Sequence, residues 1–219
     1  MKITRTVRAK VMERSRKKKL EHFFSMCNRG MNVLDVGVSS EKYKGESTLN
    51  YFLKNFPYPA TDYTGLGIHD LSGMEQLFPQ KNFVQYSGTD FPFEDNQFDW
   101  VFSNAVIEHV GCEQEQIKFV NEMFRVGKNV FFTTPNKYFP IESHTQVMFL
   151  HWNDDYFYKW LKKNKPHRSR NNLNLLSKQK LREILEKSQA TNYKIRSNLF
   201  LFLPMTFTVV CPDSQITAA

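Results

Sequence analysis

"TDFPFEDNQFDWVFSNAVIEHV", residues 89–110, is the stretch from which the fold can be predicted. Its apolar run Phe98–Asn104 predicts a β-strand buried on both faces. A polar turn follows, and then residues 113–126, whose apolar side chains recur at helical spacing. Gly127 is expected at the C′ position of this helix, in the left-handed conformation that glycine favours. The stretch therefore predicts a strand–turn–helix unit.

The same alternation recurs along the chain. Strands are expected at 33–36, 62–68, 82–86, 98–104 and 129–135, and helices at 47–55, 73–77, 113–126 and 177–187. Two further strands, 193–202 and 205–211, have almost no connector and must run antiparallel, because a parallel crossover needs about a dozen residues. We predict an α/β fold with a mostly parallel seven-stranded sheet, an antiparallel last strand and helices on both faces.

The composition favours one cytoplasmic domain. A chain of 219 residues is long enough for one α/β core, and no apolar run approaches the roughly 18 residues that span a bilayer. The three cysteines are distant from one another, which fits a reducing compartment. Because no Cys, His or Asp cluster has metal-ligand spacing, no metal site is expected.

The net charge of +8 lies almost entirely in the first 20 residues, where nine Lys and Arg face one Glu. Apolar residues recur at i, i+3, i+4 and i+7 just beyond, at Leu20, Phe23, Phe24 and Cys27. We expect residues 1–30 to form a basic arm and a helix that covers the core. The expected domain is 31–212, with a lid insertion at about 136–176 and a flexible tail at 213–219.

The arm has three interpretations. It can be the solvated face of the covering helix, which is the simplest. It can attract an anionic membrane surface, placing the protein at the inner face of the membrane. It can also bind nucleic acid, for which basic residues near the lid (162–170) would add charge, although the neutral remainder of the chain weakens this interpretation.

Three motifs resemble those of class I S-adenosylmethionine-dependent methyltransferases of the type 11 group. They are "VLDVG" (33–37), the Phe-Asp to Glu-His block within 89–110, and "EMFRVGKNVFFTTPN" (122–136). The lid also resembles lids of methyltransferases associated with cell-surface glycans and lipopolysaccharide. The resemblance implies a Rossmann-like fold, S-adenosyl-L-methionine as cofactor, and transfer to a small-molecule or glycan acceptor. RNA or protein methylation, or a non-catalytic binding protein, remain alternatives.

By this resemblance, the turns after the strands bind the cofactor. The expected contacts are Asp35, Gly37, Ser39, Ser40, His69, Asp70, Thr89, Asp90 and Asn104. The sequence departs from the family pattern in two places. Ser39 and Glu41 replace glycines of the first loop, and Gly67 stands where an acid usually accepts the ribose hydroxyls. We expect a remodelled loop that binds the methionine carboxylate through serine hydroxyls and backbone N–H groups.

Methyl transfer to a hydroxyl benefits from a general base. The candidate catalytic residues are Glu108, His109 and His144, and helix capping or core packing is the alternative role for the Glu-His pair. The candidate acceptor contacts are Tyr138, Phe139, His144, His151 and Trp152. Their aromatic rings can stack on a sugar, although ordinary lid packing accounts for them equally well.

Overall fold

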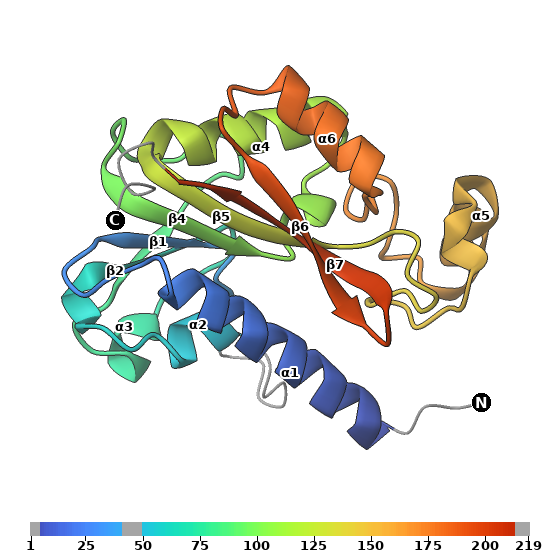
Figure 1. Cartoon of the computed structure of the whole chain (residues 1–219), viewed down its shortest axis with the longest axis horizontal. Helices are drawn as coiled ribbons and strands as arrows, with labels where there is room; N and C mark the ends of the chain where they lie inside the picture. Colours follow the sequence, from blue (N-terminus) through green and yellow to red (C-terminus); the bar gives the residue numbers. More distant parts are fainter. Residues whose placement is uncertain (1–4, 41–49, 213–219) are drawn as a thin grey trace.

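The computed structural model describes residues 5–40 and 50–212 and has three layers, a central sheet with helices on both faces (Figure 1). The seven strands lie in the order β3-β2-β1-β4-β5-β7-β6. All neighbouring pairs from β3 to β5 are parallel, and β7 runs antiparallel to both β5 and β6. The predicted fold class is confirmed.

The strands are β1 (Val33–Val36), β2 (Tyr63–Gly67), β3 (Asn82–Gln85), β4 (Phe98–Asn104), β5 (Gly127–Pro135), β6 (Lys194–Phe200) and β7 (Leu203–Cys211). The α-helices are α1 (Arg5–Phe24), α2 (Tyr51–Lys54), α3 (Met74–Leu77), α4 (Glu113–Val126), α5 (Asp154–Asn164) and α6 (Lys178–Lys187). Three 3-10 helices are η1 (Ala60–Asp62), η2 (Ile107–His109) and η3 (Leu150–Trp152). The expected tail, 213–219, and the loop 41–49 lie outside the described residues.

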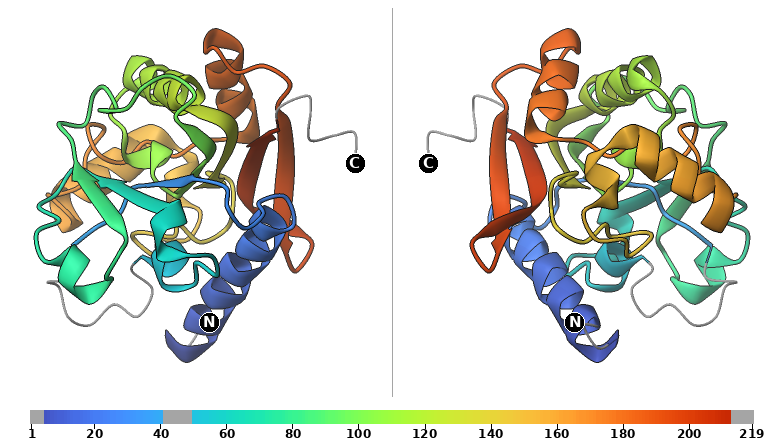
Figure 2. Two further views of the ribbon diagram at one scale, coloured as in Figure 1. Left: turned by 90° about the vertical axis from the view of Figure 1, so that its left-hand side faces the viewer. Right: turned by 90° about the vertical axis from the view of Figure 1, so that its right-hand side faces the viewer.

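The two faces of the sheet carry separate apolar cores. One contains the buried side of α4 and α6, and the other contains residues of α1, α2 and α3. Phe23 of α1 is at the centre of the second core, where its ring meets those of Trp100, Phe102 and Phe131 edge-on. The second half of α1 therefore covers this face of the sheet, and Figure 2 shows α1 lying across the sheet.

Gly127 differs from its predicted role. It is extended, with φ −120° and ψ 135°, so that α4 passes directly into β5 without a left-handed cap. A Cβ atom at this position would lie 2.4 Å from Cγ2 of Val101 on the neighbouring strand. The glycine is needed because two strands approach closely there, and a sequence pattern that marks a helix end cannot distinguish this reason from capping.

The strand order reverses between β1 and β4, since β1 is followed in the chain by β2 on one side but pairs with β4 on the other. In open α/β sheets, ligands bind beyond the carboxyl ends of the strands at such a switch point. At this edge lie the turn after β1, the turn after β4, the lid residues 136–176 and one side of α1. The candidate site is therefore expected here.

Candidate functional site

A cavity of about 200 Å³ lies at the carboxyl ends of β1 and β4, closed on one side by α1. It is lined by Arg16, Lys19, Leu20, Asp35, Val36, Gly37, Val38, Asn50, Tyr51, Phe52, Phe102, Asn104 and Ala105. The structure thus brings three predicted cofactor residues together, Asp35, Gly37 and Asn104. The cavity wall also includes two cations of the arm, Arg16 and Lys19, which the sequence interpretation placed on a solvated surface.

Lys19 is buried in this cavity and donates from Nζ to Oδ1 of Asn104 at 2.8 Å. Thr133 donates to the same oxygen, also at 2.8 Å. Because a lysine ammonium can only donate, these contacts fix which atom of the Asn104 amide is the oxygen. Burial, together with the neighbouring Arg16, lowers the pKa of Lys19 to about 8, so the side chain is still largely charged at pH 7.

The turn after β1 requires glycine. Gly37 has φ +104°, and a Cβ atom there would lie 2.3 Å from Val106. The N–H groups of Gly37 and Val38 both donate to the carbonyl of Leu66, and the N–H of Ser39 donates to Oδ1 of Asn50. The N–H groups of Gly37, Val38 and Ser39 are therefore engaged within the protein.

Asp35 is a buried acid on the floor of the cavity. Its Oδ2 accepts a hydrogen bond of 2.7 Å from the hydroxyl of Tyr63. Burial raises the pKa of Asp35 to about 7, against the opposing effects of that hydrogen bond and of Lys81. The carboxyl group therefore changes its charge near neutral pH.

The structure explains why an acid is absent from the end of β2. A Cβ atom on Gly67 would lie 2.2 Å from the carbonyl oxygen of Val38, so no side chain fits at this position. Of the two residues expected to compensate, His69 is exposed, and Asp70 is exposed and accepts from the N–H and hydroxyl of Ser72.

The remaining predicted cofactor residues lie away from the cavity lining. Thr89 is exposed and hydrogen-bonds to Ser87. Asp90 pairs with Lys118 at 2.9 Å, which lowers the pKa of Asp90. Ser39 and Ser40 precede the undescribed loop 41–49. Within the described ranges these residues, like His69 and Asp70, are not part of the cavity wall.

The three candidate catalytic residues come together, although His144 lies 36 residues from Glu108 in the sequence. Nε2 of His144 lies 3.6 Å from Oε1 of Glu108, and the rings of His109 and His144 meet edge-on at 4.6 Å. Glu108 is completely buried, and its Oε2 accepts from the hydroxyl of Thr134 at 3.0 Å. Nδ1 of His109 lies 2.9 Å from the carbonyl oxygen of Asn172.

The two histidines differ in proton affinity. Burial lowers the pKa of His109. Burial acts in the same direction on His144, but the negative charge of the adjacent Glu108 outweighs it and raises the pKa of His144. Burial disfavours the charged form of Glu108, and the two histidines outweigh this effect and lower the pKa of Glu108. The carboxylate of Glu108 therefore favours the protonated form of the His144 imidazole.

This cluster also has the composition of a metal site. One ligand atom from each of Glu108, His109 and His144 lies within 4.8 Å of the others. The spacing argument did not find this group, because His144 belongs to the lid and meets the other two only in the folded chain. Two histidines and a carboxylate can bind a divalent cation such as Zn²⁺.

The other lid residues form the outer part of the site. His151 is buried, with Nε2 at 2.8 Å from the carbonyl oxygen of Phe139, and Trp152 donates weakly to the same oxygen. Tyr138 is exposed and packs edge-on against Trp152. Of the predicted acceptor residues, only Tyr138 lines the larger cleft, of about 790 Å³, between the lid and the first turns of α4 and α6.

Comparison with known proteins finds similarity in part of the chain. A methyltransferase-domain family model matches residues 58–130, about a third of the chain. A 53-residue segment is 34% identical to an uncharacterized protein of Mycobacterium tuberculosis and covers 24% of this chain and 18% of that protein. The chain thus spans less than a fifth of the length of the curated relative it matches.

Solved structures agree on the fold. A methyltransferase from Mesorhizobium loti superposes with a TM-score of 0.56 at 13% identity, over 87% of this chain and 95% of that one. A methyltransferase from Methanosarcina mazei superposes with a TM-score of 0.54 at 15% identity, over 86% of this chain and 94% of that one. Phosphoethanolamine N-methyltransferase 2 of Haemonchus contortus superposes with a TM-score of 0.52 at 15% identity. This superposition covers 83% of this chain and 38% of that one. The chain therefore has the fold of S-adenosylmethionine-dependent methyltransferases, and its residues 58–130 are similar to a methyltransferase domain.

Proposed function

We propose that the protein transfers a methyl group from S-adenosylmethionine to a hydroxyl group of a small-molecule or glycan acceptor. The observation that carries the proposal is the cationic cavity at the strand-order switch, which a chain of hydrogen bonds connects to the Glu108–His144 pair. Lys19 in the cavity binds Asn104, Asn104 binds Thr133, and the next residue, Thr134, binds Glu108.

The cavity suits the amino-acid end of the cofactor. Its volume of about 200 Å³ is below the ~300–1,000 Å³ usual for a whole small-molecule site, so the nucleoside extends beyond it. Because the N–H donors of the turn are engaged, the cofactor carboxylate binds to Lys19 and Arg16, and ionised Asp35 binds the ammonium group. Ser39, Ser40, His69, Asp70, Thr89 and Asp90 remain candidates for the ribose and adenine contacts.

Bound S-adenosylmethionine would supply an activated methyl group, which the acceptor oxygen would take up as the carbon–sulfur bond breaks and its electron pair stays on sulfur. The acceptor proton passes to neutral His144, and the resulting imidazolium is stabilised by Glu108. His109, packed edge-on against His144, holds the ring in position. The protein's main contribution is alignment of the two reactants.

The larger cleft supports a neutral, hydroxyl-rich acceptor. Its wall contains three acids (Glu113, Glu115, Asp154) and three cations (Lys137, Arg170, Lys180), so the charges balance. Tyr138, Tyr158 and several amides complete it. Asn174 of the cleft donates to the carbonyl of Glu108, which places the cleft against the catalytic segment. A nucleic acid would need an excess of cations instead.

Calorimetric titration with S-adenosylhomocysteine tests the cofactor assignment. The proposal expects saturable binding that Asp35→Asn weakens. Absence of binding at millimolar ligand would favour a non-catalytic descendant of the fold.

Removal of metal ions is expected to leave the reaction unchanged. The proposed proton acceptor is an imidazole, which needs no Lewis acid, so transfer after dialysis against EDTA should equal that of the untreated protein. The measurement is transfer of labelled methyl groups to methyl glycosides. Loss of activity after dialysis that Zn²⁺ restores in the wild type but not in Glu108→Gln would instead assign the cluster as a metal site.

A further inference from the structure

The hairpin between β6 and β7 ends in exposed apolar residues. Phe202 is 93% exposed and Leu201 is 74% exposed, and the flanking Leu199 and Leu203 are also exposed. We call these four residues the hairpin tip. Exposure of large apolar side chains to water is unfavourable, and contiguous apolar surface of this kind marks an interaction site.

The backbone at the turn of the hairpin tip adopts a conformation that disfavours bulky side chains. Phe200 pairs with Leu203, leaving a two-residue loop in which Leu201 has φ 47° and Phe202 has φ 68°. Turns with two positive φ values favour Asn-Gly, because bulky side chains are strained there. Two large apolar residues therefore occupy strained positions and also face water. Strain retained together with exposure points to a function for these side chains.

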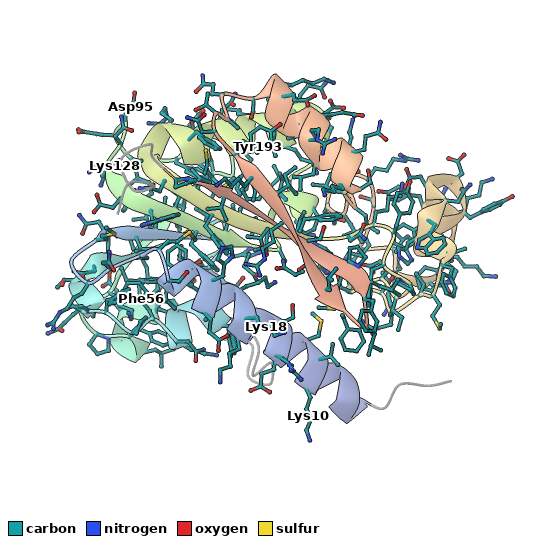
Figure 3. All side chains as sticks on the ribbon, in the orientation of Figure 1. Lys10, Lys18, Phe56, Asp95, Lys128 and Tyr193 are labelled. Atoms are coloured by element: carbon teal, nitrogen blue, oxygen red, sulfur yellow. The ribbon has the colours of Figure 1, made fainter. Side chains whose placement is uncertain are left out.

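A basic stripe lies beside the hairpin tip. Lys10, Arg14, Lys17 and Lys18 are exposed at i, i+4, i+7 and i+8 of α1, which places them on one face of the helix. The views agree that the hairpin end lies beside α1 (Figures 1 and 2), and Lys10 points away from the sheet (Figure 3). Exposed Arg196 of β6 acts electrostatically on His22 of α1, which also places the hairpin near this helix.

The lid extends the apolar surface. The rings of Phe139 in the lid and Phe200 in the hairpin lie 6.4 Å apart. Exposed Phe149, itself at φ 58°, packs edge-on against exposed Trp152, which donates to the carbonyl of Phe139. The lid thus contacts the hairpin at Phe200, which lies between two residues of the hairpin tip.

We propose that the hairpin tip inserts into the interface of an anionic lipid bilayer while the basic stripe of α1 contacts the lipid headgroups. A protruding tip suits a fluid apolar layer, which needs no groove of matching shape, and the adjacent cations match anionic headgroups. A second copy of the chain fits less well, because pairing of two tips would bring two basic stripes together. No described helix is long and apolar enough to cross a membrane, so the contact is peripheral.

The test is sedimentation of the full chain with vesicles of phosphatidylcholine alone or with added phosphatidylglycerol. The wild type should sediment with the anionic vesicles. The variant Leu201→Asn/Phe202→Gly should bind at least about tenfold more weakly, because two large apolar side chains no longer enter the bilayer. Since Asn-Gly suits this turn, the Tm of the variant should equal or exceed that of the wild type.

Controls separate the two parts of the surface. Leu77→Ser removes a leucine of similar exposure, 61%, from α3 and should leave binding unchanged. Lys17→Gln/Lys18→Gln should weaken binding several-fold at low salt and little at high salt, because salt screens exposed charges. Binding of S-adenosylhomocysteine should persist in all these variants, which keeps the result independent of the proposed activity.

Two results would overturn the proposal. One is wild-type protein that does not sediment with anionic vesicles. The other is a tip variant that binds as tightly as the wild type. A wild-type dimer in sedimentation velocity that the tip variant converts to a monomer, without vesicle binding, would assign the tip to self-association instead.

Discussion

Replacement of Lys19 by methionine is expected to weaken S-adenosylhomocysteine binding by roughly 10–100-fold, the value of one hydrogen bond to a charged group. Lys19 is the buried cation of the cavity, and the N–H donors of the adjoining turn are already engaged. Methionine preserves the length of the side chain and removes a desolvated charge, so the fold should be retained. Calorimetric titration measures the change.

Lys18→Met is the matched control, because Lys18 is the neighbouring residue of the same helix but is exposed, so this variant should bind the ligand as the wild type does. Binding should also depend on pH. Affinity rises as Asp35 ionises around pH 7 and falls as Lys19 loses its proton around pH 8. Asp35→Asn should remove the acid limb, and Lys19→Met the alkaline limb. Unchanged affinity in Lys19→Met would place the carboxylate elsewhere.

Replacement of His144 by alanine is expected to lower kcat by about 10²–10⁴-fold, the usual contribution of a general base, with little effect on cofactor affinity. Glu108→Gln should lower kcat by nearly the same factor, since residues that act as a unit have non-additive effects. Transfer of labelled methyl groups to methyl glycosides provides the measurement. His167→Ala, at an exposed histidine that follows α5, should retain full activity.

The pH dependence of kcat distinguishes a catalytic role from a structural one. The rate should rise with pH as His144 becomes neutral, because a protonated imidazole cannot accept the acceptor proton. Glu108 raises the pKa of His144, so Glu108→Gln should move this rising limb to lower pH while reducing the maximum rate. A rate that falls while its pH profile stays fixed would mean that Glu108 supports the fold only.

Most of the sheet was predictable because buried parallel strands are continuous apolar runs, as in Phe98–Asn104. The covering helix followed from the spacing of Leu20 and Phe23. The position of Lys19 was missed because its charge was counted with the exposed arm. Arg16, Lys19, Leu20 and Phe23 share one helical stripe, so the spacing contained a signal that both cations face inward.

The candidate site was less accessible from sequence. The contact between Glu108 and His144 depends on how the lid folds back, and no local pattern records it. The engagement of the Gly37 and Val38 N–H groups by Leu66 depends on the distance between two strands. The exposure of Phe202 was hidden for a related reason, since an apolar residue at the end of a strand is expected to be buried.

A crystal structure of the protein with S-adenosylhomocysteine tests the central claim most directly. The account predicts the amino-acid end of the ligand in the cavity between α1 and the turn after β1, with its carboxylate within hydrogen-bonding distance of Nζ of Lys19. A ligand bound with its carboxylate away from α1, or a cavity that stays filled by protein side chains at saturating ligand, would contradict it.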